Sequence, residues 1–373
     1  MNKMYISVYL RNHEDGPSCY YRIMQYFNKI DEYSFKINDA LSLQQFRKNM
    51  DIRCKGVKKL YQIYLFFVIF YNRFTQINYD LKHKPNIVVI QREVFPRFFP
   101  PFLKYFFIRL CEGRKVIWDF DDSILECGEI SKTEWKILSI KSDYVIATSD
   151  YLLNKVNNKF GDKICMPTTD GYCDSIDMGR IIDTRRQEYD KTVRMVWVGT
   201  HSNLQNVVEI IDQIQEAGKE LTKIGKKLEL VIVCNVEPVI SKEKYDCIHI
   251  RYRKWTRKAA EDEIFISHIG LMPIPDTEFS KGKGGFKLVQ YIASGLPVLG
   301  SDVGYNREII KEGNGALIKD KEEWISRITQ FSTDIIEWEK MCKNSLRIYD
   351  KYYSYNSNLI NWEKILKECM KND

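Results

Sequence analysis

The feature of the sequence that most restricts its fold is a repeated alternation of short apolar runs with helix-like segments. The runs in the first half are MYISVYL, PNIVVIQRE, KVIWDFDD, SDYVIATS and KICMPTTD. Those in the second half are VRMVWVGT, LELVIVCN, CIHIRY, HIGLMPI and LPVLGSD. Apolar runs rich in β-branched residues and separated by helices predict parallel sheets that are covered by helices on both faces. The expected fold class is therefore α/β.

A polar segment between the two series, DSIDMGRIIDTRRQEYDK, lacks apolar periodicity, and we interpret it as a linker. A chain of 373 residues is also too long for one ordinary core. We therefore expect two Rossmann-like, doubly wound domains, over residues 1–175 and 193–345. Ligands of such sheets bind outside the carboxyl ends of the strands, and we expect a site in the cleft between the domains.

Composition argues against several other classes of protein. The ten cysteines include no C-x-x-C pair, which argues against a zinc site and against a dense disulfide framework. The N-terminal apolar run passes directly into charged residues, unlike a signal peptide. The longest apolar run, Ile63–Tyr71, is much shorter than the roughly 20 residues that a transmembrane helix needs. We expect a cytoplasmic protein.

The segment KGKGGFKLVQYIASGLPVLGSDVG places glycines and lysines directly before an apolar helix. Glycines allow the backbone to approach a ligand closely, and the free N–H groups of a first helical turn attract phosphate. Lys281, Lys283 and Lys287 add positive charge. The pattern predicts a diphosphate ligand, although it matches neither the P-loop nor the dinucleotide-binding fingerprint. The alternative is a solvated basic loop with turn glycines.

The same region, HIGLMPIPDTEFSKGKGGFKLVQYIASGLPVLGSDVGYNREIIKEGNGALI, resembles GT-B glycosyltransferases of family 4, the glycosyl transferases group 1. The resemblance extends from Val193 to about Phe331 and includes VWVGTHSNLQNV and KWTRKAAEDEI. It implies a GT-B fold, in which two Rossmann-like domains face a central cleft. It also implies that the C-terminal helix, over residues 346–373 here, crosses back to the first domain. It also implies a retaining transfer of a sugar from a nucleotide-diphosphate sugar to a glycan or lipid-linked acceptor, in polysaccharide or glycoconjugate biosynthesis (EC 2.4).

The resemblance implies a set of donor-binding residues in the second domain. Many family members carry two glutamates here, one for the donor sugar and one for the ribose. In this chain Gly284 or Lys283 lies near the first position, and Gln290 occupies the second. A glutamine amide can still hydrogen-bond ribose hydroxyls. The expected donor-binding residues are Gly199, Thr200, Ser202, Arg253, Lys283, Gly285, Phe286, Lys287, Leu288 and Gln290.

The first domain is expected to bind the acceptor. Turn and basic residues after its strands form the predicted acceptor set: Gly16, Pro17, Ser18, Arg22 and Arg92. The motif WDFDDSI could hold a metal in a GT-A enzyme, but GT-B enzymes use helix termini and basic residues instead. We therefore interpret Asp121 and Asp122, together with Lys287, as catalytic residues. We expect no metal and no cofactor besides the nucleotide sugar.

Residues Asp51–Lys115 carry 13 Lys or Arg against 4 Asp or Glu, together with many aromatic residues. A basic and aromatic surface can lie on an anionic membrane. We expect peripheral contact with the inner face of the plasma membrane through residues 57–110, and the alternative is ordinary core helices. No nucleic-acid-binding module is recognisable, so we do not expect a nucleic acid partner.

Two other functions remain open from the sequence. A non-catalytic GT-B homologue, serving as a scaffold or glycan-binding subunit, is favoured by the missing first glutamate. A nucleotide-sugar epimerase would need a catalytic acid pair or a histidine, for which the sequence offers no clear position.

Overall fold

The computed structural model describes residues 4–52, 54–241 and 244–371, in two compact units. The first unit comprises residues 1–168, 282–284 and 356–373, and the second comprises residues 169–281 and 285–355. The outer ends of the predicted domains, residues 1 and 373, lie outside the described residues. Each unit contains a six-stranded sheet whose paired strands are all parallel, which confirms the predicted α/β class.

The sheet of the first unit has the strand order β2-β1-β3-β4-β5-β6. Its strands are β1 (Met4–Leu10), β2 (Tyr33–Asp39), β3 (Ile87–Gln91), β4 (Lys115–Phe120), β5 (Tyr144–Ala147) and β6 (Asp162–Cys165). Alternate residues of a strand point to opposite faces of its sheet. In β4 both Val116 and Ile117 are fully buried, so helices cover both faces.

The helices of the first unit form two groups. One core joins β1, β3, β4 and β5 to apolar side chains of α4, α5, α6 and α7. The second group includes α2 and α17. Phe27 of α2 packs edge to face on Trp362 of α17, with ring centroids 5.0 Å apart. The helices are α1 (Pro17–Cys19), a π-helical turn (Tyr20–Met24), α2 (Gln25–Phe27), α3 (Leu43–Asp51), α4 (Lys55–His83), a 3-10 turn (Pro101–Leu103), α5 (Lys104–Cys111), α6 (Lys132–Lys141), α7 (Asp150–Asn154) and α17 (Tyr355–Lys371).

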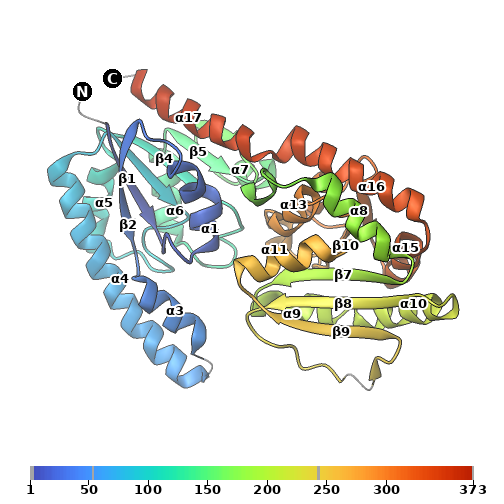
Figure 1. The fold of residues 1–373 in the computed structure, drawn as a ribbon. Helices are drawn as coiled ribbons and strands as arrows, with labels where there is room; N and C mark the ends of the chain where they lie inside the picture. Colours follow the sequence, from blue (N-terminus) through green and yellow to red (C-terminus); the bar gives the residue numbers. More distant parts are fainter. Residues whose placement is uncertain (1–3, 53, 242–243, 372–373) are drawn as a thin grey trace. The chain divides into compact units, whose positions relative to one another are not determined.

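The sheet of the second unit has the order β12-β11-β10-β7-β8-β9. Its strands are β7 (Thr192–Gly199), β8 (Lys227–Cys234), β9 (Ile248–Lys254), β10 (Ile269–Met272), β11 (Val298–Ser301) and β12 (Gly315–Ile318). Met195 and Trp197 of β7 enter one core with α10, α15 and α16, whereas Val196 and Val198 enter a second core with α11 and α13. Figure 1 shows α10 behind the strands of this sheet.

The helices of the second unit follow its strands in the βα alternation that the sequence predicts. They are a 3-10 turn (Gly171–Cys173), α8 (Met178–Tyr189), α9 (His201–Val208), α10 (Ile211–Lys223), α11 (Arg257–Ile266), α12 (Glu278–Lys281), α13 (Phe286–Ala293), α14 (Asn306–Ile309), α15 (Lys321–Thr333), α16 (Ile335–Ile348) and a π-helical turn (Tyr349–Tyr353). Across the described part of the chain, no helix is both long enough and apolar enough to cross a membrane.

The linker predicted in the middle of the chain is wrong in its central part, because α8 forms there. Asp177 caps its first turn by accepting a hydrogen bond from the backbone N–H of Arg180. Its buried residues, Ile182, Arg185 and Tyr189, are spaced by three and four positions and share one face. The buried face includes an arginine, so a search for apolar periodicity misses this helix.

Arg185 is buried, and its guanidinium forms hydrogen bonds with the ends of two other helices. It donates hydrogen bonds to the carbonyl oxygens of Ile264 and Phe265, near the end of α11, and of Ser294, after α13. The last carbonyl groups of a helix have no partner within that helix, and they attract a cation. Burial lowers the pKa of Arg185 to about 10. α8 therefore holds α11 and α13 in place.

We predict that Arg185→Ala lowers the free energy of unfolding by about 3 kcal/mol, because three buried carbonyl groups lose a charged donor. The neighbouring Arg186 is the matched control, since it is exposed and forms a surface ion pair with Glu339. Arg186→Ala should cost less than about 1 kcal/mol. Urea unfolding of both variants measures the difference, and equal losses would contradict this role of Arg185.

Candidate functional site

The carboxyl end of β7 leads into α9 through a tight turn. A side chain at Gly199 would collide with the ring of Trp197, since an added Cβ would lie 2.4 Å from it. The hydroxyl oxygens of Thr200 and Ser202 lie 2.9 Å apart, and the backbone N–H of His201 donates to Asn235 Oδ1 at 2.8 Å. Thr200 and Ser202 are exposed. The turn therefore presents two hydroxyl groups to solvent at the edge where ligands of such sheets bind.

The start of α13 lies beside this turn. Gly285 precedes the helix with a φ of 62°, a conformation that glycine adopts without strain, and an added Cβ would lie 2.4 Å from Ile309. The first backbone N–H groups of α13 follow, at Phe286, Lys287 and Leu288. The ammonium nitrogen of Lys287 lies 5.8 Å from the centre of the Trp197 ring of β7. This geometry suits an anion at the helix terminus.

Gln290, on the second turn of α13, is held by an acidic residue that the sequence analysis did not identify. Its amide nitrogen Nε2 lies 3.0 Å from Asp170 Oδ2. Its backbone carbonyl accepts a hydrogen bond from the hydroxyl group of Tyr172 at 3.0 Å. Gln290 and Asp170 are 7% and 4% exposed, respectively. No sequence pattern connects these two residues, which lie far apart along the chain.

Two of the predicted donor-binding cations have other neighbours. Arg253 of β9 places its Nε 3.6 Å from Glu263 Oε1 of α11. Lys283 belongs to the first unit, where burial lowers its pKa and the nearby Asp122 partly offsets that effect. The donor-binding role of both residues stays a prediction.

The first unit gathers charged side chains after β3 and β4. Arg92, which follows β3, donates to Asp121 at 2.7 Å and to Asp122 and Glu129 at 2.9 Å each. Its backbone is left-handed, with a φ of 63°, which is unusual for a residue other than glycine. Ser18 completes the cluster with a 2.6 Å hydrogen bond from its hydroxyl group to Asp121. The structure thus brings together Ser18, Arg92, Asp121 and Asp122.

The two aspartates of this cluster have different environments. Burial opposes ionisation of Asp121, but the ion pair with Arg92 outweighs it and lowers the pKa. Burial and the neighbouring Asp121 charge raise the pKa of Asp122 to about 6. Two adjacent carboxyl groups with divergent pKa values are typical of functional sites. Their catalytic role stays a prediction.

Arg22 joins segments of the first unit in this structure. Its guanidinium binds Asp119 through Nε and Nη2 and donates from Nη1 to Met166 O and Thr168 Oγ1. The side chain is 1% exposed, so the geometry supports a positioning role and not a direct contact with an acceptor. Of the other predicted acceptor residues, Gly16 is buried and Pro17 is exposed after β1. Their contact with the acceptor stays a prediction.

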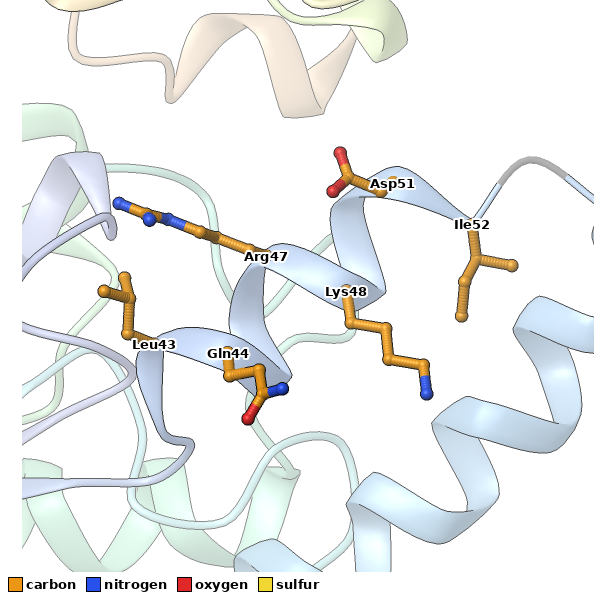
Figure 2. Close-up of a pocket in the computed structure, with 6 residues that line it drawn as sticks. All are labelled: Leu43, Gln44, Arg47, Lys48, Asp51 and Ile52. Atoms are coloured by element: carbon orange, nitrogen blue, oxygen red, sulfur yellow. The ribbon is translucent and has the colours of Figure 1, made fainter.

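The search for a metal site and the surface hollow in Figure 2 lead away from the predicted site residues. Within the described ranges, no group of three or more His, Cys, Asp or Glu side chains is arranged to hold a metal ion. The hollow lies against α3, has a volume of about 530 Å³ and is lined by Leu43, Gln44, Arg47, Lys48, Asp51 and Ile52. Arg47 at this hollow pairs with Asp15. None of the predicted site residues lines it.

Comparisons with known proteins concern the fold and the family of this chain. Residues 192–334 match the sequence profile of the family described as glycosyl transferases group 1. No curated protein matches the sequence. A glycosyltransferase structure from Rickettsia africae ESF-5 is similar over 100% of both chains, with 14% identity and a TM-score of 0.63. Anabaena HepE in complex with UDP-glucose is similar over 98% of this chain and 100% of that chain, with 12% identity and a TM-score of 0.64.

A third similar structure is the pneumococcal O-GlcNAc transferase GtfA in complex with UDP and GlcNAc. It shares 15% identity and a TM-score of 0.54, over 79% of this chain and 59% of that chain. At these identities the likeness shows the fold. Two parallel doubly wound sheets that match such structures along the chain define the GT-B class.

The profile match adds a family resemblance to this fold class. Residues 192–334, most of which lie in the second unit, match the glycosyl transferases group 1, the family that the sequence resembles. The profile match and the fold together indicate a glycosyltransferase that uses a nucleotide sugar.

The loop that carries Arg92 depends on a buried carboxyl group of α6. Glu134 accepts hydrogen bonds from the backbone N–H groups of Val94, at 2.6 Å, and Phe95, at 3.2 Å. Burial raises the pKa of Glu134 from 4.5 to about 8. Between these pH values the folded state binds more protons than the unfolded state, so stability must fall as the pH rises.

We predict that the free energy of unfolding falls between pH 5 and pH 8, by on the order of 1.4 kcal/mol per pH unit from this group. Glu134→Gln removes that contribution, whereas Glu112→Gln, at a surface ion pair, leaves it in place. Urea unfolding at several pH values measures both slopes. Because Asp122 and Asp170 also titrate in this range, part of the slope should remain in Glu134→Gln. A slope equal to that of the wild type would show that Glu134 does not contribute.

Proposed function

We propose that the second unit binds a nucleoside diphosphate sugar and that the first unit presents a hydroxyl group of a glycan or lipid-linked acceptor. The observation that carries the proposal is the start of α13. There a left-handed glycine, three first-turn amides and Lys287 lie beside the carboxyl end of β7. Amide donors and a cation at a helix terminus are suited to a diphosphate.

In the proposed complex the diphosphate lies on the amides of Phe286, Lys287 and Leu288. Lys287 neutralises part of its charge, and the hydroxyl groups of Thr200 and Ser202 donate to its oxygens. The nucleoside extends toward Gln290. The relatives from Anabaena and from pneumococcus were solved with UDP-glucose or with UDP and GlcNAc, so UDP-sugars are the first donors to test.

The proposed reaction retains the configuration of the sugar. The acceptor hydroxyl attacks the anomeric carbon from the face of the leaving group, the bond from that carbon to the diphosphate oxygen breaks, and the hydroxyl proton passes to the departing diphosphate. The amides and Lys287 stabilise the charge that develops on the leaving group. Asp121 and Asp122, fixed by Arg92, orient the acceptor. This step requires no metal ion from the protein, and the expected biological setting is polysaccharide or glycoconjugate synthesis.

We predict that incubation with a panel of nucleotide sugars releases the nucleoside diphosphate of the correct donor. Lys287→Ala should reduce this release by about 10- to 100-fold, since a charged hydrogen bond contributes about 1.5–3 kcal/mol. Lys340→Ala, at an exposed position of α16, is the control and should leave it unchanged. Tight binding of a donor without any turnover would instead favour a non-catalytic scaffold.

A second part of the proposal is peripheral contact with the cytoplasmic face of an anionic membrane. On α4, Leu60, Tyr64, Phe67 and Tyr71 follow helical spacing and are 71%, 52%, 66% and 69% exposed. Phe102 and Tyr105, before and on α5, are also exposed, and α5 packs against α4. α4 lies between α3 and α5 in Figure 1.

Basic residues border this apolar surface. Lys55 and Lys59 at the start of α4, Arg97 before α5 and Lys104 at its start are exposed. Single exposed apolar residues are normal, but a contiguous patch with basic neighbours is typical of a surface that binds membranes. A lipid-linked acceptor would be delivered at such a surface.

We predict that the protein sediments with vesicles that contain anionic lipid and much less with neutral vesicles, since each surface cation contributes about 1 kcal/mol. Replacing Leu60, Phe67 and Tyr71 together by serine should reduce the bound fraction several-fold. Phe160→Ser is the control, because Phe160 is 92% exposed away from α4. Absence of binding at low salt, or an equal loss in the control, would contradict the membrane contact.

A further inference from the structure

Asp170 is a buried carboxylate. Its contribution to the stability of the fold does not by itself explain why a carboxylate stands at this position. It is 4% exposed, and the hydrogen bonds that it accepts come from neutral groups. Its oxygens accept hydrogen bonds from Gln290 Nε2, at 3.0 Å, and from the backbone N–H of Tyr172, at 3.3 Å. Burial raises its pKa to about 6, which reflects the cost of the charge. A serine or an asparagine would cap the same turn at lower cost.

The carboxylate determines how the Gln290 amide is turned. An ionised carboxylate accepts hydrogen bonds and donates none, so the NH₂ group of Gln290 must face Asp170. The carbonyl oxygen Oε1 therefore points to the opposite side. Within the described part of the chain, no residue donates a hydrogen bond to this oxygen.

Both partners are also held through their backbones. The hydroxyl group of Tyr172 donates to the carbonyl oxygen of Gln290 at 3.0 Å, and that of Tyr349 donates to the carbonyl oxygen of Asp170 at 3.1 Å. All four residues belong to the second unit. Since the side chains and the backbones are fixed together, the amide presents one acceptor oxygen in a defined direction.

We propose that Asp170 is a positioning residue that orients Gln290 so that its carbonyl oxygen accepts a hydrogen bond from a ribose hydroxyl of the nucleotide. The inference rests on the proposed function of the second unit as the nucleotide site. It also explains why this chain carries glutamine and not glutamate at the position. A second carboxylate about 3 Å from Asp170 would be repelled, whereas an amide offers an acceptor oxygen and bonds to the aspartate as well.

The test is calorimetric titration with UDP, 2′-deoxy-UDP and 3′-deoxy-UDP, extended to GDP and ADP with their deoxy analogues. The wild type should lose about 10-fold in affinity when the recognised hydroxyl is absent. Gln290→Ala and Asp170→Ala should each lower the affinity for the ribonucleotide to that for its deoxy analogue. Neither variant should change the affinity for the deoxy analogue. The double variant should lose no more, because one residue acts through the other. Asp183→Ala, at an exposed position of α8 in the same unit, is the control and should leave the difference in affinity between the ribonucleotide and its deoxy analogue as in the wild type.

If Asp170→Ala folds poorly, a second pair of variants, in which the carboxylate and the amide exchange positions, tests the same inference. Gln290→Glu alone should weaken UDP binding, and adding Asp170→Asn should restore it, because the new amide then donates to the new carboxylate. The inference is overturned if the folded Asp170→Ala protein keeps wild-type discrimination, if it weakens both nucleotides equally, or if the exchanged pair binds no better than Gln290→Glu. Failure of every ribonucleotide to bind the wild type would instead contradict the proposed function itself.

Discussion

The functional residues of each unit depend on the parallel direction of its strands. Parallel strands end at the same edge of their sheet, so residues distant in sequence meet where those strands end. In the first unit this constraint brings Ser18, after β1, to Arg92, after β3, and to Asp121, after β4. In the second unit the end of β7 and the start of α13 meet through Trp197 and Lys287.

The two units present different chemistry at these edges. The first unit holds a compact cluster of paired charges, in which Arg92 binds three carboxylates from a strained backbone position. Paired charges of this kind orient groups more than they attract a large anion. The second unit offers amides, hydroxyl groups and a lysine at a helix terminus, which suit a diphosphate. This division agrees with an acceptor side in the first unit and a donor side in the second.

Much of the fold could be predicted from the sequence because parallel strands are continuous apolar runs. The run MYISVYL coincides with β1, and the alternation predicts both sheets. The glycine and lysine segment before α13 could also be predicted, because glycines with a left-handed backbone at the start of a helix leave a local signature. α8 could not, since its buried face includes Arg185, whose partners come from distant helices. The pairing of Asp170 with Gln290 is likewise a tertiary contact without a local pattern. For Arg22 the sequence indicates importance but not its burial against Asp119.

The central claim is that a nucleoside diphosphate binds at the start of α13, and the most direct measurement is a crystal structure of the protein with UDP or with the nucleotide of its donor. We predict that the diphosphate contacts the backbone amides of Phe286, Lys287 and Leu288 and the Lys287 ammonium, with the ribose facing Gln290. A nucleotide bound elsewhere, or bound there with its diphosphate directed away from α13, would contradict it.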